Sequence, residues 1–255
     1  MAFVALFGTA AARTGDPQEL YVAGNYQEAI DAGIAQGTAS GFAVAAHAAL
    51  ANATIRAPCL DCIARAEGLA RHAIALDAKL PEGHLYFAVA LGYEARIRGP
   101  VVARAKGLVE EAKTNLDAAL AADPNNARVL AALGGWNIAI VSKGGATLGR
   151  WLYGASLDEG MKDFARAFRA APEDVALPYQ YALSLASYDA VEHRREIEMS
   201  LSRVIGGKPA TAYDSLTQAR ARALLRLLKT NSDSFQHLVR QYQGYASGDA
   251  TGSPR

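Results

Sequence analysis

The chain has 255 residues, about half of them hydrophobic, with a net charge of +1 and only two cysteines. This is enough apolar material for one large buried core or a solenoid. The near-neutral charge provides no global field to attract nucleic acid, so nucleic-acid binding is set aside. Abundant alanine and few β-branched residues favour helix over strand.

Residues 2–12 form an apolar run that includes three consecutive alanines. Such a run is typical of a signal-peptide core with a small-residue cleavage site, although the positive n-region is missing. The alternative is an apolar first helix. We therefore expect residues 1–12 to be a signal-peptide remnant or a first helix, with a periplasmic or exported protein favoured over a cytoplasmic one. No other segment has eighteen uninterrupted apolar residues, so no transmembrane segment is predicted.

Cys59 and Cys62 follow Pro58, where a helix is expected to begin. Their spacing brings the two sulfur atoms near each other, so a local disulfide in an oxidising compartment is the first choice and an inert thiol pair the alternative. A thioredoxin-like redox role needs a βαβ context, and zinc needs two further ligands. We therefore expect no metal site and no cofactor.

Apolar residues recur at helical spacing along most of the chain after the Gly24–Ile30 segment, which reads as a turn followed by a helix. We expect one helical domain over residues 16–245 and a disordered tail over the small and polar residues 246–255. In chain order, the long helices are expected at 61–77, 82–97, 103–122, 127–142, 157–171, 175–189, 192–205 and 212–229.

The junction from Asp123 to Asn126 carries the clearest motif. Pro124 cannot continue a helix, and Asn126 is a suitable N-cap for the next one. An alanine-rich helix, a proline and a second apolar helix in this order resemble the tetratricopeptide repeat (TPR). The resemblance implies an all-α fold, namely a TPR-like right-handed α-solenoid of antiparallel helix pairs.

The repeats are longer than in an ordinary TPR. Equivalent alanines fall at Ala73, Ala119 and Ala167, which gives periods of 46 and 48 residues, whereas a TPR repeats at about 34. The extra residues lie between the first and second helix of each unit, near 99–102 and within 142–157. In solenoids, insertions on one face often mark the binding face.

Three further segments, at 133–136, 149–154 and 157–167, combine a Leu-Gly-Gly-Trp helix, an aromatic–glycine insertion and an alanine-bearing helix. They resemble the TPR domain of the regulator of microtubule dynamics family, which includes the protein tyrosine phosphatase-interacting protein. The chain is also similar to the T-component TPR proteins of TRAP transporters, mostly over 156–227. The two resemblances cover about residues 60–227. They imply an all-helical superhelix with an apolar groove or pore, which in the first family is implicated in phospholipid binding.

Aromatic and arginine side chains provide the candidate ligand contacts. Tyr86 and Tyr93 share one stripe of the 82–97 helix, and the 149–154 insertion places two large aromatics beside glycines. Such residues either complete the core or form the mouth of a groove, where an arginine would meet an anionic head group. The candidate ligand-binding residues are Tyr93, Arg96, Trp136, Arg150, Trp151, Tyr153 and Tyr181.

No catalytic constellation is found. The five histidines are scattered without a pair at i,i+3 or i,i+4, and the glycine-rich segment 144–150 lacks the Lys-Ser/Thr ending of a phosphate loop. We expect a non-catalytic TPR-like binding protein whose concave groove holds an apolar or amphipathic ligand such as a phospholipid. The alternative is a protein–protein interaction adaptor that binds a partner helix or peptide.

Overall fold

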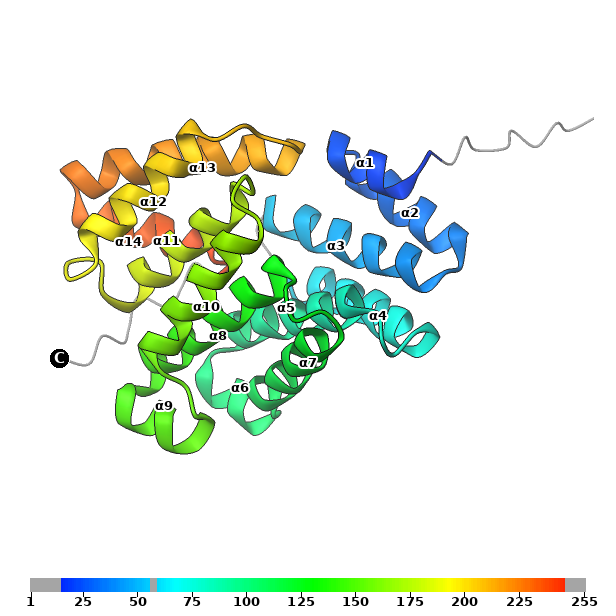
Figure 1. Ribbon diagram of the computed structural model, residues 1–255, viewed down its shortest axis with the longest axis horizontal. Coiled ribbons are helices and arrows are strands. Elements are labelled where there is room, and N and C mark those ends of the chain that lie inside the picture. The colour runs from blue at the N-terminus through cyan, green and yellow to red at the C-terminus, as the bar shows by residue number, and fades with distance from the viewer. Residues whose placement is uncertain (1–14, 56–58, 246–255) are drawn as a thin grey trace, which may run out of the picture.

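In the computed structural model, residues 15–55 and 59–245 are described, and they form fourteen α-helices and no strand (Figure 1). The fold is therefore all-α, as predicted. The expectations for residues 1–12 and 246–255 lie outside the described residues. The helices are α1 (Pro17–Ala23), α2 (Tyr26–Gln36), α3 (Ala39–Ile55), α4 (Leu60–Leu76), α5 (Pro81–Arg98), α6 (Pro100–Ala105), α7 (Leu108–Ala122), α8 (Ala127–Gly144), α9 (Ala146–Tyr153), α10 (Leu157–Ala170), α11 (Ala176–Asp189), α12 (Arg194–Gly206), α13 (Ala212–Thr230) and α14 (Ser232–Tyr242).

The helices pack as a solenoid-like series of pairs. Helix α3 packs on α4, α5 on α7, α8 on α10, α11 on α12, and α13 on α14. Two short helices interrupt this series, α6 inside the α5–α7 pair and α9 inside the α8–α10 pair. The insertions therefore lie between the first and second helix of a unit, where the long repeat spacing predicted them.

The repeat spacing is confirmed by the way three helices end. Ala73, Ala119 and Ala167 are all fully buried, near the ends of α4, α7 and α10. The carbonyl oxygen of each accepts the backbone N–H of the residue four positions later, at 2.9, 3.0 and 3.0 Å respectively. The backbone after each helix then leaves the helical region. The same turn thus recurs after 46 and 48 residues.

The sequence-based helix assignments omit α3 and α9 and differ from the structure at two further places. The single helix expected at 103–122 is wrong, because Gly107 adopts a φ of +67° and separates α6 from α7. Glycine reaches this left-handed region without the steric cost that other residues meet. The sequence interpretation also stopped at residue 229 and missed α14. Asn231 ends α13 and caps α14, accepting the Ser234 N–H at 2.9 Å.

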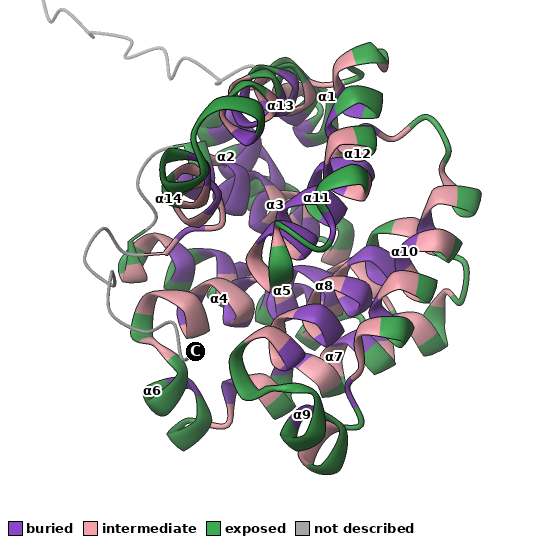
Figure 2. Ribbon diagram, turned by 90° about the vertical axis from the view of Figure 1, so that its left-hand side faces the viewer, coloured by how far each residue is buried: buried purple, intermediate pink, exposed green. Residues whose placement is uncertain are grey.

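Close helix packing depends on small residues. A Cβ on Gly134 of α8 would lie 2.6 Å from Cδ2 of Phe164 and 2.8 Å from the Gly160 carbonyl oxygen of α10. Only glycine therefore permits this approach. Alanines have a similar role in the N-terminal core, where Ala45, Ala46, Ala48, Ala66 and Ala70 are fully buried. Figure 2 shows the resulting core as a continuous buried centre with exposed outer turns.

Helix α13, near the C-terminal end of the described chain, packs against the N-terminal helices α1 and α3. A guanidinium nitrogen of Arg220 in α13 donates to the Thr54 carbonyl oxygen of α3 at 2.7 Å, and the Tyr213 hydroxyl lies 3.3 Å from Thr54 Oγ1. At the other end of this contact, a Cβ on Gly24 would lie 2.7 Å from the Cβ of Ala212. The series of pairs is thus closed by α13 against α1 and α3 (Figure 1). Among the described helices, none combines the length and hydropathy needed to span a bilayer.

Candidate binding groove

A groove of about 510 Å³ opens beside the turns that precede α5, α8 and α11. These turns are the equivalent junctions of three consecutive repeats, and α1 and α3 complete the wall. The groove is therefore a product of repeat stacking rather than of one motif. Its apolar lining residues are Ala43, Val44, Leu80, Leu85, Ala127 and Ala171.

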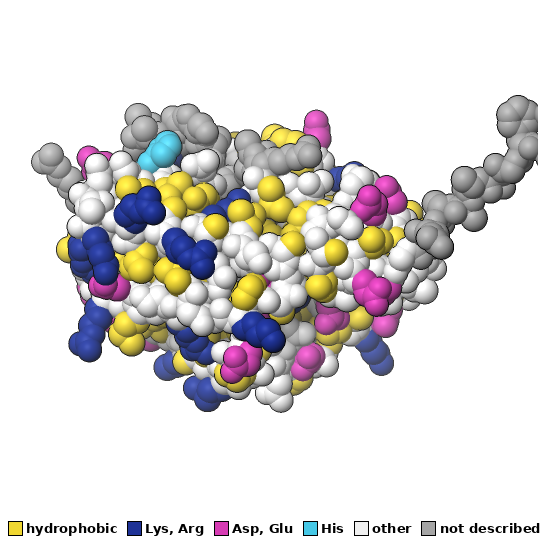
Figure 3. Space-filling view, turned by 90° about the horizontal axis from the view of Figure 1, so that it is seen from above, with side chains coloured by type: hydrophobic (Ala, Val, Ile, Leu, Met, Phe, Trp, Pro, Cys, Tyr) yellow, Lys and Arg dark blue, Asp and Glu magenta, His cyan; other side chains and the backbone are white. Residues whose placement is uncertain are grey.

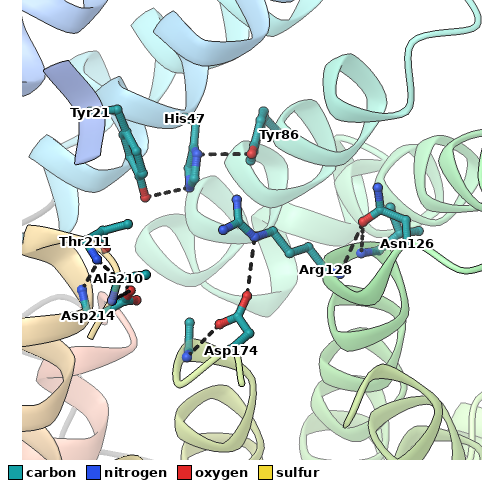
Figure 4. Close-up of polar contacts among 11 residues, drawn as sticks. Tyr21, His47, Tyr86, Asn126, Arg128, Asp174, Ala210, Thr211 and Asp214 are labelled. Carbon is teal, nitrogen blue, oxygen red and sulfur yellow. Dashed lines mark hydrogen bonds and ion pairs between the residues drawn. The ribbon is translucent and has the colours of Figure 1, made fainter. Parts of the chain in front are cut away.

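The centre of the polar wall is a stack of three rings (Figure 4). The His47 imidazole of α3 lies between Tyr21 of α1 and Tyr86 of α5, with ring centroids 4.1 and 4.4 Å away. The Tyr21 hydroxyl is 2.9 Å from His47 Nε2, and the Tyr86 hydroxyl is 3.0 Å from Nδ1. Both ring nitrogens therefore have a phenol partner.

The environment keeps His47 neutral. Burial, reinforced by the positive charge of Arg128, holds the pKa of His47 well below its ordinary value. A neutral imidazole has one donor and one acceptor nitrogen, so one tyrosine donates to the ring and the other accepts from it. The accepting tyrosine keeps its own O–H proton available. Either tautomer therefore leaves one phenol in this wall as a donor.

Arg128, at the start of α8, provides the positive charge of the groove. Its guanidinium Nε lies 3.7 Å from an Asp174 carboxylate oxygen, and 48% of the arginine side chain is exposed. Burial disfavours the charged form, but Tyr86 and Asp174 outweigh it and raise the pKa of Arg128. The same guanidinium is close enough to Tyr21 to oppose the raised pKa that burial gives that phenol. Figure 4 shows the guanidinium directed toward the rings.

The start of α8 holds Arg128 in place through its cap. The Asn126 side chain accepts the backbone N–H groups of Arg128 and Val129 at 3.2 and 3.3 Å. Asp174 is fixed similarly, since its other oxygen accepts the Ala176 N–H at 2.9 Å. Glu82, in the first turn of α5, adds a second carboxylate to the lining. Hydrogen bonds to the first turns of α8 and α11 thus position a cation and a carboxylate on consecutive repeats.

The seven ligand-binding residues predicted from the sequence all lie outside the groove. Tyr93 is half-buried, and burial raises its pKa to about 12. The Arg96 guanidinium lies over the Tyr93 ring at 5.2 Å and lines a separate hollow of about 20 Å³. That volume is about the size of one water molecule. This pair is therefore in a different place from the groove.

The other predicted aromatics pack on neighbouring helices or face solvent. Trp136 donates to the Val109 carbonyl oxygen at 3.2 Å and meets Tyr153 edge-on at 6.2 Å. Tyr181 is buried against Phe164, at a centroid distance of 5.0 Å. Arg150 and Trp151 are exposed on α9, with 78% of Trp151 accessible. None of these lines the groove.

Cys59 and Cys62 are joined by a disulfide. Cys59 is also the N-cap of α4, and its sulfur accepts the Cys62 backbone N–H at 3.1 Å. The bond lies at the first turn of a helix, where the sequence placed it.

The groove residues that the sequence analysis missed are His47, Arg128 and Asp174, and it left Tyr86 open between the core and a groove without naming it as a candidate ligand contact. Tyr86 is indeed buried, yet it also borders the groove. The sequence did contain a signal for the groove, because Arg128 and Asp174 occupy the turns at consecutive repeat junctions. This signal could be interpreted only once the structure showed how those junctions stack.

Within the described residues, no group of three or more histidine, cysteine, aspartate or glutamate side chains is placed to hold a metal ion. No protein-family model matches the chain, and no curated protein matches it. Its function is accordingly argued from the groove.

Proposed function

We propose that this chain is a non-catalytic binding protein whose groove holds a small amphipathic ligand with an anionic group. The observation that carries the proposal is the Arg128 guanidinium, which faces two phenols beside a neutral histidine inside a concave surface. Arginine binds carboxylate and phosphate through charge-assisted hydrogen bonds, and a phenol can add a further donor. An anionic group fits this end of the groove.

The apolar part of the lining suits an apolar body. Ala43, Val44, Leu80 and Leu85 come from α3 and the start of α5, and they present only hydrocarbon. Small-molecule pockets of roughly 300–1,000 Å³ bury most of a drug-sized ligand, and the groove volume of about 510 Å³ lies in this range. A single-chain amphiphile, such as a fatty acid or a lysophospholipid, is the form of the lipid hypothesis that this volume supports best.

The polar wall is arranged for binding rather than for acid–base chemistry. Both nitrogens of His47 are occupied by phenol partners, and its low pKa disfavours the protonated form. A general base must reach the proton it removes, and here the hydrogen-bonding positions of the ring are already used. This supports a binding role.

A peptide is the second candidate, and the carboxylates favour it. Eight of the fourteen lining residues are polar, and Glu82 and Asp174 place negative charge beside Arg128. An extended peptide ending in a free carboxylate would use both signs of charge, with its terminus on Arg128 and its amide groups along the wall. This is the adaptor function in its most specific form.

We include in this proposal a relation to TPR proteins, which the equivalent turns after α4, α7 and α10 support. The Cys59–Cys62 disulfide supports an oxidising compartment, such as a bacterial periplasm, for the same protein.

Titration of a fluorescent fatty acid and of a lysophospholipid tests the groove. We expect the Arg128→Gln variant to bind at least about tenfold more weakly, because it loses a charge-assisted hydrogen bond. Arg150→Gln is the matched control, since Arg150 is exposed on α9 and outside the groove. Native mass spectrometry of the purified protein should also reveal a bound amphiphile.

The outcomes separate the two candidates. If both probes bind the wild type and Arg128→Gln equally, the groove is not the site and the proposal is wrong. If neither probe binds but a peptide library yields ligands that need Arg128 and a free carboxyl terminus, the peptide function replaces the amphiphile.

A further inference from the structure

The two insertions that lengthen the repeats are built alike. Gly99 and Gly145 have nearly the same backbone angles, with φ of 80° and 77° and ψ of 165° and 160°. Each starts a short helix, and a left-handed glycine follows it, Gly107 with φ 67° and Gly154 with φ 66°. Other residues rarely adopt positive φ, so each insertion depends on its own two glycines, one before and one after the short helix. We call residues 99–107 and 145–154 together the insertion rim.

The insertion rim exposes large apolar side chains. Val101 and Val102 of α6 are 81% and 39% exposed, and Leu148 and Trp151 of α9 are 45% and 78% exposed. Ten large hydrophobic side chains are exposed among the described residues, and four of them lie on these two short helices. Single exposed hydrophobic residues need no explanation, but a concentration of them marks a contact surface.

Each helix of the insertion rim has one face that packs on the body of the protein. Ala103 of α6 is buried, and Gly149 of α9 lies against Ile140 and Val141. The apolar side chains that remain exposed are therefore on the outward faces, where no described residue covers them. Packing inward fixes the orientation of both helices.

Basic side chains outnumber acidic ones in the insertion rim. Residues 99–107 and 145–154 contain Arg104, Lys106 and Arg150 and no Asp or Glu. Acidic residues lie next to the rim, and Glu110 is near enough to Tyr153 to add to the raised pKa that burial gives its hydroxyl. Glu94 pairs with Arg98 and Lys106, at 3.1 Å for the lysine. Arg104 and Arg150 are exposed, and neither has an ion-pair partner in the described part of the chain. The insertion rim is thus positively charged, although the whole chain is close to neutral.

Helices α6 and α9 lie along the same edge of the molecule. They are at the lower edge in Figure 1 and remain there in Figure 2, which turns the molecule about the vertical axis. The opposite face, in Figure 3, mixes hydrophobic, basic and acidic side chains. The upper face in Figure 3 thus carries charges of both signs.

We propose that the insertion rim docks onto the surface of an anionic lipid bilayer. A bilayer interface favours tryptophan and aliphatic side chains at the boundary and lysine or arginine near the head groups, which is the combination on this edge. Charge complementarity selects anionic over zwitterionic lipid. A nucleic acid or an acidic protein would use the cations and would leave the four apolar side chains without a role. The inference does not depend on what the groove binds.

Co-sedimentation with vesicles tests the proposal. We expect the protein to bind phosphatidylcholine vesicles containing phosphatidylglycerol at least about tenfold more strongly than phosphatidylcholine alone. The Leu148→Ser/Trp151→Ser and Val101→Ser/Val102→Ser variants should each lose most of this binding. The matched control is Val191→Ser/Met199→Ser, because Val191 and Met199 are 88% and 62% exposed but lie outside the insertion rim.

Tryptophan fluorescence gives an independent readout. The chain has two tryptophans, and Trp136 is packed between helices. A blue shift on adding anionic vesicles should therefore come from Trp151 and disappear in Trp151→Phe, while co-sedimentation is retained.

Three results would overturn the inference. The first is equal binding to both vesicle types, and the second is an equal loss of binding in the control variant. The third is binding to a single-stranded oligonucleotide or to polyglutamate that is as strong as vesicle binding and that the serine variants do not weaken. The last result would assign the insertion rim to a polyanion instead of a bilayer.

Discussion

The groove and the insertion rim use the same kinds of residue in opposite ways. In the groove, Tyr21, Tyr86 and Arg128 are held by a stacked histidine and by the cap of α8. In the insertion rim, Trp151 and Arg150 project from a short helix into solvent. The difference teaches that aromatic and arginine side chains form a pocket only where several helices converge to orient them. On a projecting helix they form a surface that adapts to a partner.

The groove should depend on the close packing of α8 against α10. Gly134→Ala should destabilise the protein by roughly 2–3 kcal/mol, because the new Cβ clashes with Phe164 and the Gly160 backbone. It should also weaken groove binding by pushing α8 away from α10. Gly135→Ala is the matched control, since its Cβ would meet Ser184 at an ordinary 3.7 Å. Denaturant unfolding and fatty-acid titration measure both effects.

The ring stack should contribute to stability as well as to binding. Tyr21→Phe/Tyr86→Phe removes both partners of His47, and leaving buried polar atoms unpaired should cost roughly 1–3 kcal/mol. Tyr188→Phe serves as the control, because no hydrogen bond is assigned to that hydroxyl among the described residues. Denaturant unfolding would show the loss. An unchanged unfolding free energy in the double variant would mean that the stack is only a surface feature.

The stack should also make stability depend on pH. The pKa of His47 is lowered in the folded protein, so the unfolded chain binds a proton that the folded chain does not once the pH falls below the ordinary value of 6.5. The stabilisation is complete above that pH and is lost as the pH falls toward the folded pKa, by up to about 1.4 kcal/mol per pH unit. Unfolding measured between about pH 7.5 and 5.5 should show this slope, and His47→Gln should flatten it. A slope that persists in the variant would assign it to other groups.

The salt dependence of binding should give the smallest of the expected differences between the groove and the insertion rim. Charges on the insertion rim are exposed, so vesicle binding should fall several-fold between about 50 and 300 mM salt. The Arg128 contact lies in a concave, partly desolvated site and should change less. Parallel titrations with vesicles and with the fatty acid would show it, and an equal loss for both would indicate that the groove is as open to solvent as the insertion rim.

Several features of the fold were predictable because they depend on local chemistry. Pro124 and Asn126 mark a helix junction wherever they occur in this order, and Ala119 belongs to a buried stripe set by helical spacing. The break at Gly107 was missed, because a glycine within an apolar helical pattern does not reveal its φ. Helix α14 was missed because Asn231 serves two helices and reads as a single stop.

The site was less predictable than the fold. The aromatic residues of the 149–154 insertion were conspicuous in the sequence, yet the structure places Trp151 in solvent and Tyr153 against Trp136. In the sequence, His47 is one of five scattered histidines. Only the packing of α1 and α5 against α3 shows that a tyrosine lies on each side of it. Sequence spacing shows which residues share a helix face, but not which face meets another element.

The sequence by itself determined the helical character of the chain, most of the long helices with the turns between them, and the elongated repeat, because hydrophobic period, proline and capping residues act within a few positions of the chain. The tertiary structure alone decided where the groove lies, since Tyr21, His47, Tyr86, Arg128 and Asp174 come from five separate segments and converge only when the repeats stack. It also decided that two insertions 46 residues apart would share one edge. Packing between distant elements sets both, and no local pattern encodes it.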